Sequence, residues 1–431
     1  MFTEKTRLGY HEPEEVEASP ERLDVIASIV EDGLEQKAFP GCQVLVAKDG
    51  MIIYDKSFGY FDYDKKQAVD ENSVYDLASS SKAAGTLLAV MKAYDDKKFT
   101  LNNKISDFIP ELKDSDKKNL AVKDLLYHQS GLTPTINFYL NAIDKDSYKG
   151  SLYSTAKKTQ THPVRFDART YVRNDFSFLP NLVSARKKPG FTTEIARNMY
   201  LHDSFKDTII QEIKDSRLGV RGKYKYSCIN FILLKMMVEK QMRQPMDRLL
   251  HGKLGAWHTA YNPLHILDTM QIVPTENDHF IRRQLLRGYV HDEAAAFQGG
   301  VSGNAGLFSN ANDLAKVLQL YLNQGSYGGE QYLSKETCRL FTQSKSPTCR
   351  RGLGFDKPVA GGGKASPCGS LAPASVYGHT GFTGTCFWVD PDNNLLYIFL
   401  SNRVNPTRAN NKLGSLDIRT RIQDAIYKAI K

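Results

Sequence analysis

The strand-forming segments of this chain lie at its two ends, and this placement limits the possible folds more than any other feature. Residues 43–48 and 51–58 flank an Asp-Gly dipeptide, which favours a hairpin turn. Near the other end, residues 385–389 and 395–400 carry few charges, as strands covered on both faces do. The region between, about 79–285, reads as mostly helical. We therefore predict an α/β fold of the α+β kind, with a central antiparallel sheet built from both termini, flanking helices and a large helical insertion.

This pattern predicts one composite catalytic domain behind a short N-terminal extension. The extension covers residues 1–19, the sheet subdomain covers 20–78 and 286–431, and the helical subdomain covers 79–285. Helices are expected over residues 20–36, with Ser19 as N-cap, and over residues 415–430.

A basic and aromatic insertion, residues 133–200, carries much of the net charge of +9. It contains eleven Lys/Arg against five Asp/Glu, and ten aromatic residues. A solvated helical insertion explains this composition, and so does a pocket rim, wall or lid that attracts anionic or aromatic substrates. No nucleic-acid-binding module is recognisable, so we expect no nucleic-acid partner.

Several classes of protein are disfavoured by what the sequence lacks. The six cysteines show no Cys-x-x-Cys spacing and the histidines no His-Glu-x-x-His, so we expect neither a metal site nor a cofactor. No apolar stretch approaches the roughly 18 residues that span a bilayer, so stable membrane insertion is not expected. The N-terminus as written is not a signal peptide, which leaves a mature exported, periplasmic domain or a cytoplasmic protein. Cys349 and Cys368 flank a glycine-rich loop and could pair after export.

One Ser-x-x-Lys segment stands out as a candidate nucleophile with its base. A serine hydroxyl reacts poorly until a neighbouring group takes its proton, and Ser79 and Lys82 would project from one face of a first helical turn. The partial positive charge of such a helix N-terminus would favour an oxyanion and disfavour a protonated lysine. Ser79 follows an apolar strand-like run and leads into a buried-helix pattern. The same spacing recurs by chance elsewhere, at Ser115/Lys118, Ser154/Lys157 and Ser184/Lys187.

Three ordered motifs carry a resemblance to a known family. Ala-Ser-Ser-Ser-Lys at 78–82, Tyr-Ser-Cys at 226–228 and His-Thr-Gly at 379–381 resemble the active-site motifs of serine β-lactamase-related proteins. The likeness is to the class C-like branch with its esterases and D-amino-acid peptidases, in forms typical of Bacteroidetes-type serine hydrolases. Flanking stretches that fit are residues 125–132, 288–293, 303–309 and 381–385. It implies a β-lactamase/transpeptidase-like fold over about residues 20–431.

The resemblance also implies roles for individual residues. Ser79 would be acylated, Lys82 would share or relay its proton, and Tyr226 would act as general base and then as acid to the leaving group. Backbone N–H groups of Ser79 and Phe382 would form the oxyanion hole. Substrate would bind along Cys228, His379, Thr380 and Gly381.

Two departures from the family pattern shape the expected substrate. Cys228 stands where relatives usually have Asn, and a thiol cannot offer the donor and acceptor of an amide. His379 stands where many β-lactamases have Lys, and histidine is largely neutral near pH 7. Both favour an ester, or another small-molecule or peptide-like acyl group, over a β-lactam.

Three functions therefore stay open. The first is a serine acyl hydrolase of esterase or D-amino-acid amidase type that forms an acyl-Ser79 intermediate. The second is an acyltransferase that moves the acyl group to an alcohol or amine. The third is a non-catalytic, penicillin-binding-like sensor that keeps the fold. The oligomeric state stays open.

Overall fold

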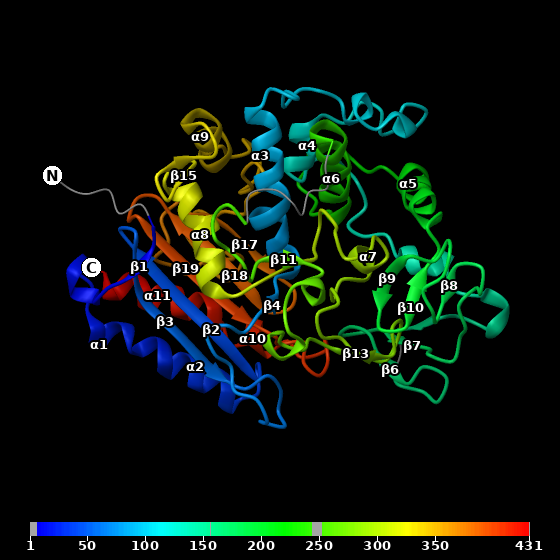
Figure 1. Ribbon diagram of the computed structural model, residues 1–431, viewed down its shortest axis with the longest axis horizontal. Helices are drawn as coiled ribbons and strands as arrows, with labels where there is room; N and C mark the ends of the chain where they lie inside the picture. Colours follow the sequence, from blue (N-terminus) through cyan, green and yellow to red (C-terminus); the bar gives the residue numbers. More distant parts are fainter. Residues whose placement is uncertain (1–6, 156, 244–251, 431) are drawn as a thin grey trace.

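The centre of the protein is a six-stranded sheet that joins the two ends of the chain (Figure 1). The computed structural model describes residues 7–155, 157–243 and 252–430. The strand order is β1-β3-β2-β19-β18-β17, and every neighbouring pair is antiparallel except β1 with β3. The strands are β1 (Gly9–Tyr10), β2 (Gly41–Lys48), β3 (Met51–Gly59), β17 (Tyr377–Gly381), β18 (Thr385–Asp390) and β19 (Leu395–Ser401). The predicted sheet from both termini is confirmed.

The two faces of this sheet belong to two different hydrophobic cores, because successive side chains of a strand point to opposite faces. In β2, Leu45 and Ala47 pack into the core shared with the helical region. Val44 and Val46 pack into a second core beneath the terminal helices. Both β18 and β19 are buried along their whole length, which explains their low charge content.

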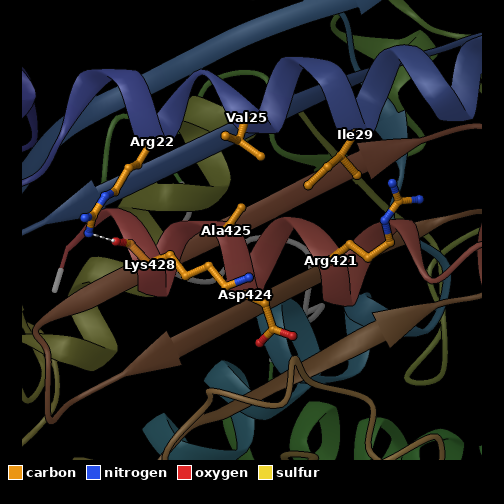
Figure 2. A pocket seen from close by; sticks show the side chains of 7 residues that line it. All are labelled: Arg22, Val25, Ile29, Arg421, Asp424, Ala425 and Lys428. Atoms are coloured by element: carbon orange, nitrogen blue, oxygen red, sulfur yellow. Dashed lines mark hydrogen bonds between the residues drawn. The ribbon is translucent and has the colours of Figure 1, made fainter.

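The outer face of the sheet is covered by helices from both termini, α1 (Pro20–Leu23), α2 (Val25–Glu35), α10 (Lys412–Ser415) and α11 (Ile418–Ala429). Ser19 caps α1 as expected, and the predicted N-terminal helix is divided at Asp24. Between α2 and α11 lies a groove of about 630 Å³, shown in Figure 2. Its walls contain no serine, cysteine or histidine, so this groove is not a candidate reaction centre.

The inner face carries the helices that surround the reaction centre. Helix α8 packs on β2 and β19, and α3 lies between α6 and α9. The helices here are α3 (Leu87–Asp95), α4 (Val122–Leu126), α5 (Phe205–Asp215), α6 (Cys228–Met242), α7 (Glu293–Ala296), α8 (Ala311–Leu322) and α9 (Lys335–Gln343). Asn310 caps α8 by accepting the N–H of Asp313.

The helical character predicted for the insertion 133–200 is wrong. Its described residues form 3₁₀ turns and two small three-stranded sheets, ordered β5-β7-β6 and β8-β10-β9. Short aromatic and β-branched runs separated by turn residues suit strands, and none is long enough for a stable helix. The strands are β5 (Tyr153–Ser154), β6 (Val164–Arg165), β7 (Tyr171–Val172), β8 (Val183–Ser184), β9 (Thr193–Ala196) and β10 (Met199–Leu201).

Smaller pairings complete the structure and one of them positions the nucleophile. Strand β14 pairs with β4 immediately before Ser79 and with β11 on its other side. These strands are β4 (Tyr75–Asp76), β11 (Ala260–Tyr261), β12 (Asn277–Asp278), β13 (Gln284–Leu285), β14 (Leu307–Ser309), β15 (Ser326–Tyr327) and β16 (Glu330–Gln331). The division into subdomains stays a prediction.

Candidate active site

Ser79 lies in a tight turn between β4 and α3, on the inner side of the sheet. The residue before it, Ala78, has a φ of 46°, a left-handed conformation that is unfavourable for alanine. The side chain of Asp76 holds this turn, because Oδ1 accepts the N–H of Ala78 at 2.8 Å and Oδ2 accepts the N–H of His291 at 2.7 Å. Burial raises the pKa of Asp76. The result is a half-buried serine at the tip of a braced turn.

Lys82 is fully buried directly beneath this serine. Its ammonium donates to Ser79 Oγ at 3.0 Å, to the carbonyl of Asn304 at 2.8 Å and to Cys228 Sγ at 3.5 Å. Regular α-helix begins only at Leu87, after a 3₁₀ turn and a π-helical turn, but these turns keep Ser79 and Lys82 on one side. Burial lowers the pKa of Lys82, whereas its coupling to Cys228 and Tyr226 raises it, so the net shift is upward. The structure thus does not support the expected disfavoured ammonium, because the Ser79 hydroxyl and the Asn304 carbonyl both accept hydrogen bonds from it.

Tyr226 completes the triad from the N-terminal end of α6. Its ring centroid lies 5.1 Å from Lys82 Nζ, close enough for the cation to interact with the ring. Burial raises the pKa of this phenol, and the nearby Lys82 charge and interactions with Lys82 and Ser79 lower it, with a net upward shift. The ring stacks on buried His128, with centroids 4.6 Å apart. Tyr226 is thus held between the Lys82 ammonium and the His128 ring.

Strand β17 passes very close to the turn that carries Ser79, which explains the glycine of the His-Thr-Gly motif. A Cβ atom on Gly381 would lie 2.4 Å from the carbonyl oxygen of Leu77 and 2.1 Å from Thr385 Oγ1. The Thr385 hydroxyl donates to that same Leu77 carbonyl at 2.9 Å. The next residue, Phe382, lines the same cavity as Ser79, and an oxyanion-hole role for its N–H stays a prediction.

His379 is buried and neutral because a guanidinium lies behind it. Arg351 Nη2 donates to His379 Nε2 at 3.4 Å, while His379 Nδ1 donates to the carbonyl of Thr380 at 2.7 Å. Burial, and then the charges of Arg351 and Lys82, lower the pKa of His379 to about 3. Arg351 is 1% exposed and pairs with Asp356 at 2.9 Å, and its Nε has no partner in the described part of the chain. A fixed positive charge therefore stands behind a neutral imidazole.

A cavity of about 170 Å³ opens beside the nucleophile. Its walls are Ala78, Ser79, His291, Asp292, Glu293, Ala305, Phe382 and Arg408. Glu293 pairs with Arg408 at 2.5 Å, whereas Oδ1 of Asp292 accepts the N–H of Ala295 and the Asn304 side chain, both neutral donors. Of the two carboxylates, Asp292 is therefore the one without a cationic partner among the described residues.

The insertion supports this site from outside the cavity. Its residues do not line the 170 Å³ cavity, so the wall or lid predicted there is wrong for the space next to Ser79. Its first residues contact the second motif instead, because the N–H of Cys228 donates to the Pro134 carbonyl at 2.9 Å. Phe166 packs on Arg408, whose guanidinium carbon lies 4.9 Å from the ring centroid. The same Phe166 lines a second hollow of about 330 Å³ on the far side of Arg408.

The structure brings together all of the site residues expected from the sequence. Cys228 is 9% exposed beside Lys82, and burial raises the pKa of its thiol. The Cys349 and Cys368 thiols are both free, and the described residues contain no cluster of three or more metal-ligating side chains. Within the described chain, no helix has the length and apolarity needed to cross a membrane.

Three residues of the site were not predicted from the sequence. His128 and Asn304 lie within stretches that fitted the family pattern, but neither had a signal that assigned it a role. Arg351 had no signal at all, because an arginine in an Arg-Gly-Leu-Gly segment is usually a surface residue. Only the fold places it behind His379.

The sequence matches the family described as Beta-lactamase over residues 26–419. The chain belongs to the beta-lactamase family. It is a serine hydrolase of that family, which confirms the resemblance drawn from its motifs. It is 30% identical to an Escherichia coli (strain K12) protein named "Putative D-alanyl-D-alanine carboxypeptidase", with 97% of this chain and 93% of that protein covered.

Solved structures share the β-lactamase-type fold. The hydrolase EstCE1, described as having promiscuous acyltransferase activity, superimposes with a TM-score of 0.63 at 16% identity, covering 94% of this chain and 99% of that one. A class C beta-lactamase gives a TM-score of 0.60 at 14% identity, with coverages of 95% and 97%. The predicted β-lactamase/transpeptidase-like fold is confirmed.

Proposed function

We propose that this protein is an acyl hydrolase that works through an ester formed on Ser79. The observation that carries the proposal is the Lys82 ammonium, 3.0 Å from Ser79 Oγ, together with the Tyr226 ring, whose centroid lies 5.1 Å from the same ammonium. A serine, a cation and a phenol in mutual contact are the parts needed to move a proton off the nucleophile and onto a leaving group.

The reaction follows from these positions. Ser79 Oγ attacks the substrate carbonyl carbon, its proton passes to the Lys82–Tyr226 pair, and the N–H groups of Ser79 and Phe382 stabilise the oxyanion. The bond to the leaving group breaks as Tyr226 protonates it, and water, activated by the same pair, then cleaves the acyl-Ser79 ester. Because both pKa values are shifted upward, the pair becomes a base only after losing a proton. Acylation should therefore accelerate as the pH rises from 7 to 9.

The substrate class follows from the charge behind His379. The Arg351 guanidinium is buried and paired with Asp356, so it would favour a substrate carboxylate near the His-Thr-Gly strand through space and not by a direct hydrogen bond. The relatives named as D-alanyl-D-alanine carboxypeptidases point to the same chemistry, a peptide that ends in a free carboxylate. We accordingly extend the proposal from simple esters to short peptides or depsipeptides with a free C-terminus. An exported, periplasmic location would suit such substrates and stays a prediction.

The acyl-enzyme is tested by labelling. A fluorophosphonate added to the full chain should give one adduct, on Ser79, detected by mass spectrometry of the digested protein. The Ser79→Ala variant should show none, whereas Ser115→Ala, which changes a chance Ser-x-x-Lys match, should label like the wild type. Undiminished labelling of Ser79→Ala would refute the mechanism. Loss of labelling in Ser115→Ala would show that the wrong serine had been chosen.

The carboxylate preference is tested with matched substrates. A depsipeptide with a free terminal carboxylate is compared with the same compound capped as an amide, in wild type and in Arg351→Lys. We expect the wild type to prefer the free carboxylate by about tenfold in kcat/KM, and the variant to lose most of that preference. Equal rates for the two substrates in the wild type would remove Arg351 from substrate selection, and the acyl-enzyme result would be unaffected.

Acyl transfer is the second candidate. One observation favours it: the structurally similar EstCE1 is described as having acyltransferase activity. Product analysis in the presence of an added alcohol or amine separates the two. Acyl-acceptor product in excess over free acid would establish transfer.

A further inference from the structure

Lys357 is a buried cation that the proposed reaction does not use. It is 3% exposed, and Nζ donates to the carbonyl of Thr342 at 3.0 Å. No carboxylate of the described residues forms an ion pair with it. An ammonium buried without a counter-charge is costly, so such a residue needs a reason. Burial and the nearby charge of Lys345 lower its pKa to about 8, which still leaves it largely charged at neutral pH.

This lysine lines a cavity of about 320 Å³ between β17, the C-terminal end of α8 and α9. Arg339 and Lys345 add two more cations to the lining, against the single carboxylate of Asp392. The Ser375 hydroxyl donates to that carboxylate at 2.7 Å, which leaves its negative charge in place. Three cations and one carboxylate thus line the cavity, an excess of two positive charges. The described lining residues are Tyr321, Leu322, Gln324, Arg339, Thr342, Gln343, Lys345, Lys357, Ala374, Ser375, Tyr377, Pro391 and Asp392.

We propose that this cavity binds a small oxyanion, a phosphate or a carboxylate, with Lys357 as its principal ligand. The ammonium has three N–H donors and one carbonyl acceptor, so two donors stay available to an anion. An anion here would supply the missing counter-charge for Lys357 and would be attracted by both cations of the rim. The cavity is far larger than one phosphate needs, so a larger molecule that carries the oxyanion also fits.

The location links this site to the reaction centre without entering it. Tyr377 and His379 lie two residues apart in β17, so their side chains point to the same face of the sheet. Tyr377 lines the Lys357 cavity, and His379 contacts Arg351. Asp356, the residue before Lys357, is the partner of that Arg351. A bound oxyanion would therefore lie one residue along the chain from the ion pair behind His379.

Calorimetric titration of the full chain tests the proposal, with sodium phosphate and sodium acetate as probes at constant ionic strength in chloride. We expect saturable binding of at least one of them, and the tighter of the two identifies the anion. Lys357→Met removes the ammonium at nearly constant size and should weaken binding at least tenfold. Lys113→Met, which removes an exposed lysine outside the cavity, should bind like the wild type. No saturable heat with either anion, or equal binding by Lys357→Met, would overturn the proposal.

Two further measurements keep the test decisive if Lys357→Met fails to fold. Lys345→Met changes only the exposed rim and should weaken binding about threefold or more. The unfolding temperature of the wild type should rise with anion concentration and continue to rise logarithmically after the site is filled, as expected for a ligand of the folded state. A shift that Lys345→Met does not reduce would place the anion elsewhere and refute the assignment.

Discussion

The neutral His379 predicts a specific weakness of the folded protein toward acid. In an unfolded chain this histidine takes up a proton near pH 6.5, but in the folded protein it does so only near pH 3. Between these values the unfolded state binds more protons, so the free energy of unfolding decreases as the pH falls through this window. Above the window, His379 is neutral in both states and this loss is absent. Replacing His379 by glutamine removes the titrating group, while the glutamine oxygen can still accept a hydrogen bond from Arg351.

The size of the effect follows from the shift. A group with pKa values of 6.5 unfolded and about 3 folded lowers the free energy of unfolding by about 0.2 kcal/mol at pH 7 and by about 2 kcal/mol at pH 5. The free energy of unfolding of wild type minus that of His379→Gln should therefore fall by about 2 kcal/mol between pH 7 and pH 5. Acid-sensitive groups that do not interact with His379 cancel in this difference.

The assay is urea unfolding at pH 7 and pH 5, followed by tryptophan fluorescence, since buried Trp388 reports on the sheet. His265→Gln, which alters an exposed histidine, is the matched control and should follow the wild type at both pH values. A wild-type minus His379→Gln difference that stays constant within about 0.5 kcal/mol would refute the reasoning. An NMR titration that placed the His379 pKa between 6 and 7 would refute the reasoning as well.

Three other substitutions test the site. Tyr226→Phe should lower kcat/KM at least about 100-fold while substrate binding persists, measured by steady-state kinetics and by a binding assay, and equal turnover would remove Tyr226 from the mechanism. Cys228→Asn restores the amide that relatives carry and should raise amide relative to ester turnover severalfold, whereas an unchanged ratio would show that Cys228 does not select the substrate. Gly381→Ala must push Leu77 and Thr385 apart, so we expect a lower melting temperature together with at least tenfold less activity, and a fully active variant would contradict the described approach.

The main sheet was predictable because its signals are local. The hairpin around Asp49 and Gly50, the low charge of residues 385–389 and 395–400, and the Ser19 cap depend on neighbours within a few residues. The prediction of a helical insertion was wrong for the opposite reason. Its two- to four-residue strands are stabilised by pairing with one another and by packing of aromatic rings, and such short segments carry no readable period.

The candidate active site also combines residues that the local sequence predicts with residues that only the fold brings together. Ser79 and Lys82 are three residues apart, so their contact is a local consequence of one turn. Tyr226 and His379 had to be placed through family motifs, because no local pattern connects them to Ser79. Arg351 has a sequence environment like that of many surface arginines.

The sequence by itself therefore predicted the contact between Ser79 and Lys82 and the sheet built from both ends of the chain. The tertiary structure decided the protonation states of the site residues, because pKa values depend on burial and on neighbours brought from distant segments. It made His379 neutral, placed Arg351 behind it and kept the ammonium of Lys82. It also left Lys357 buried without a counter-charge, a property that no sequence pattern around that lysine reveals.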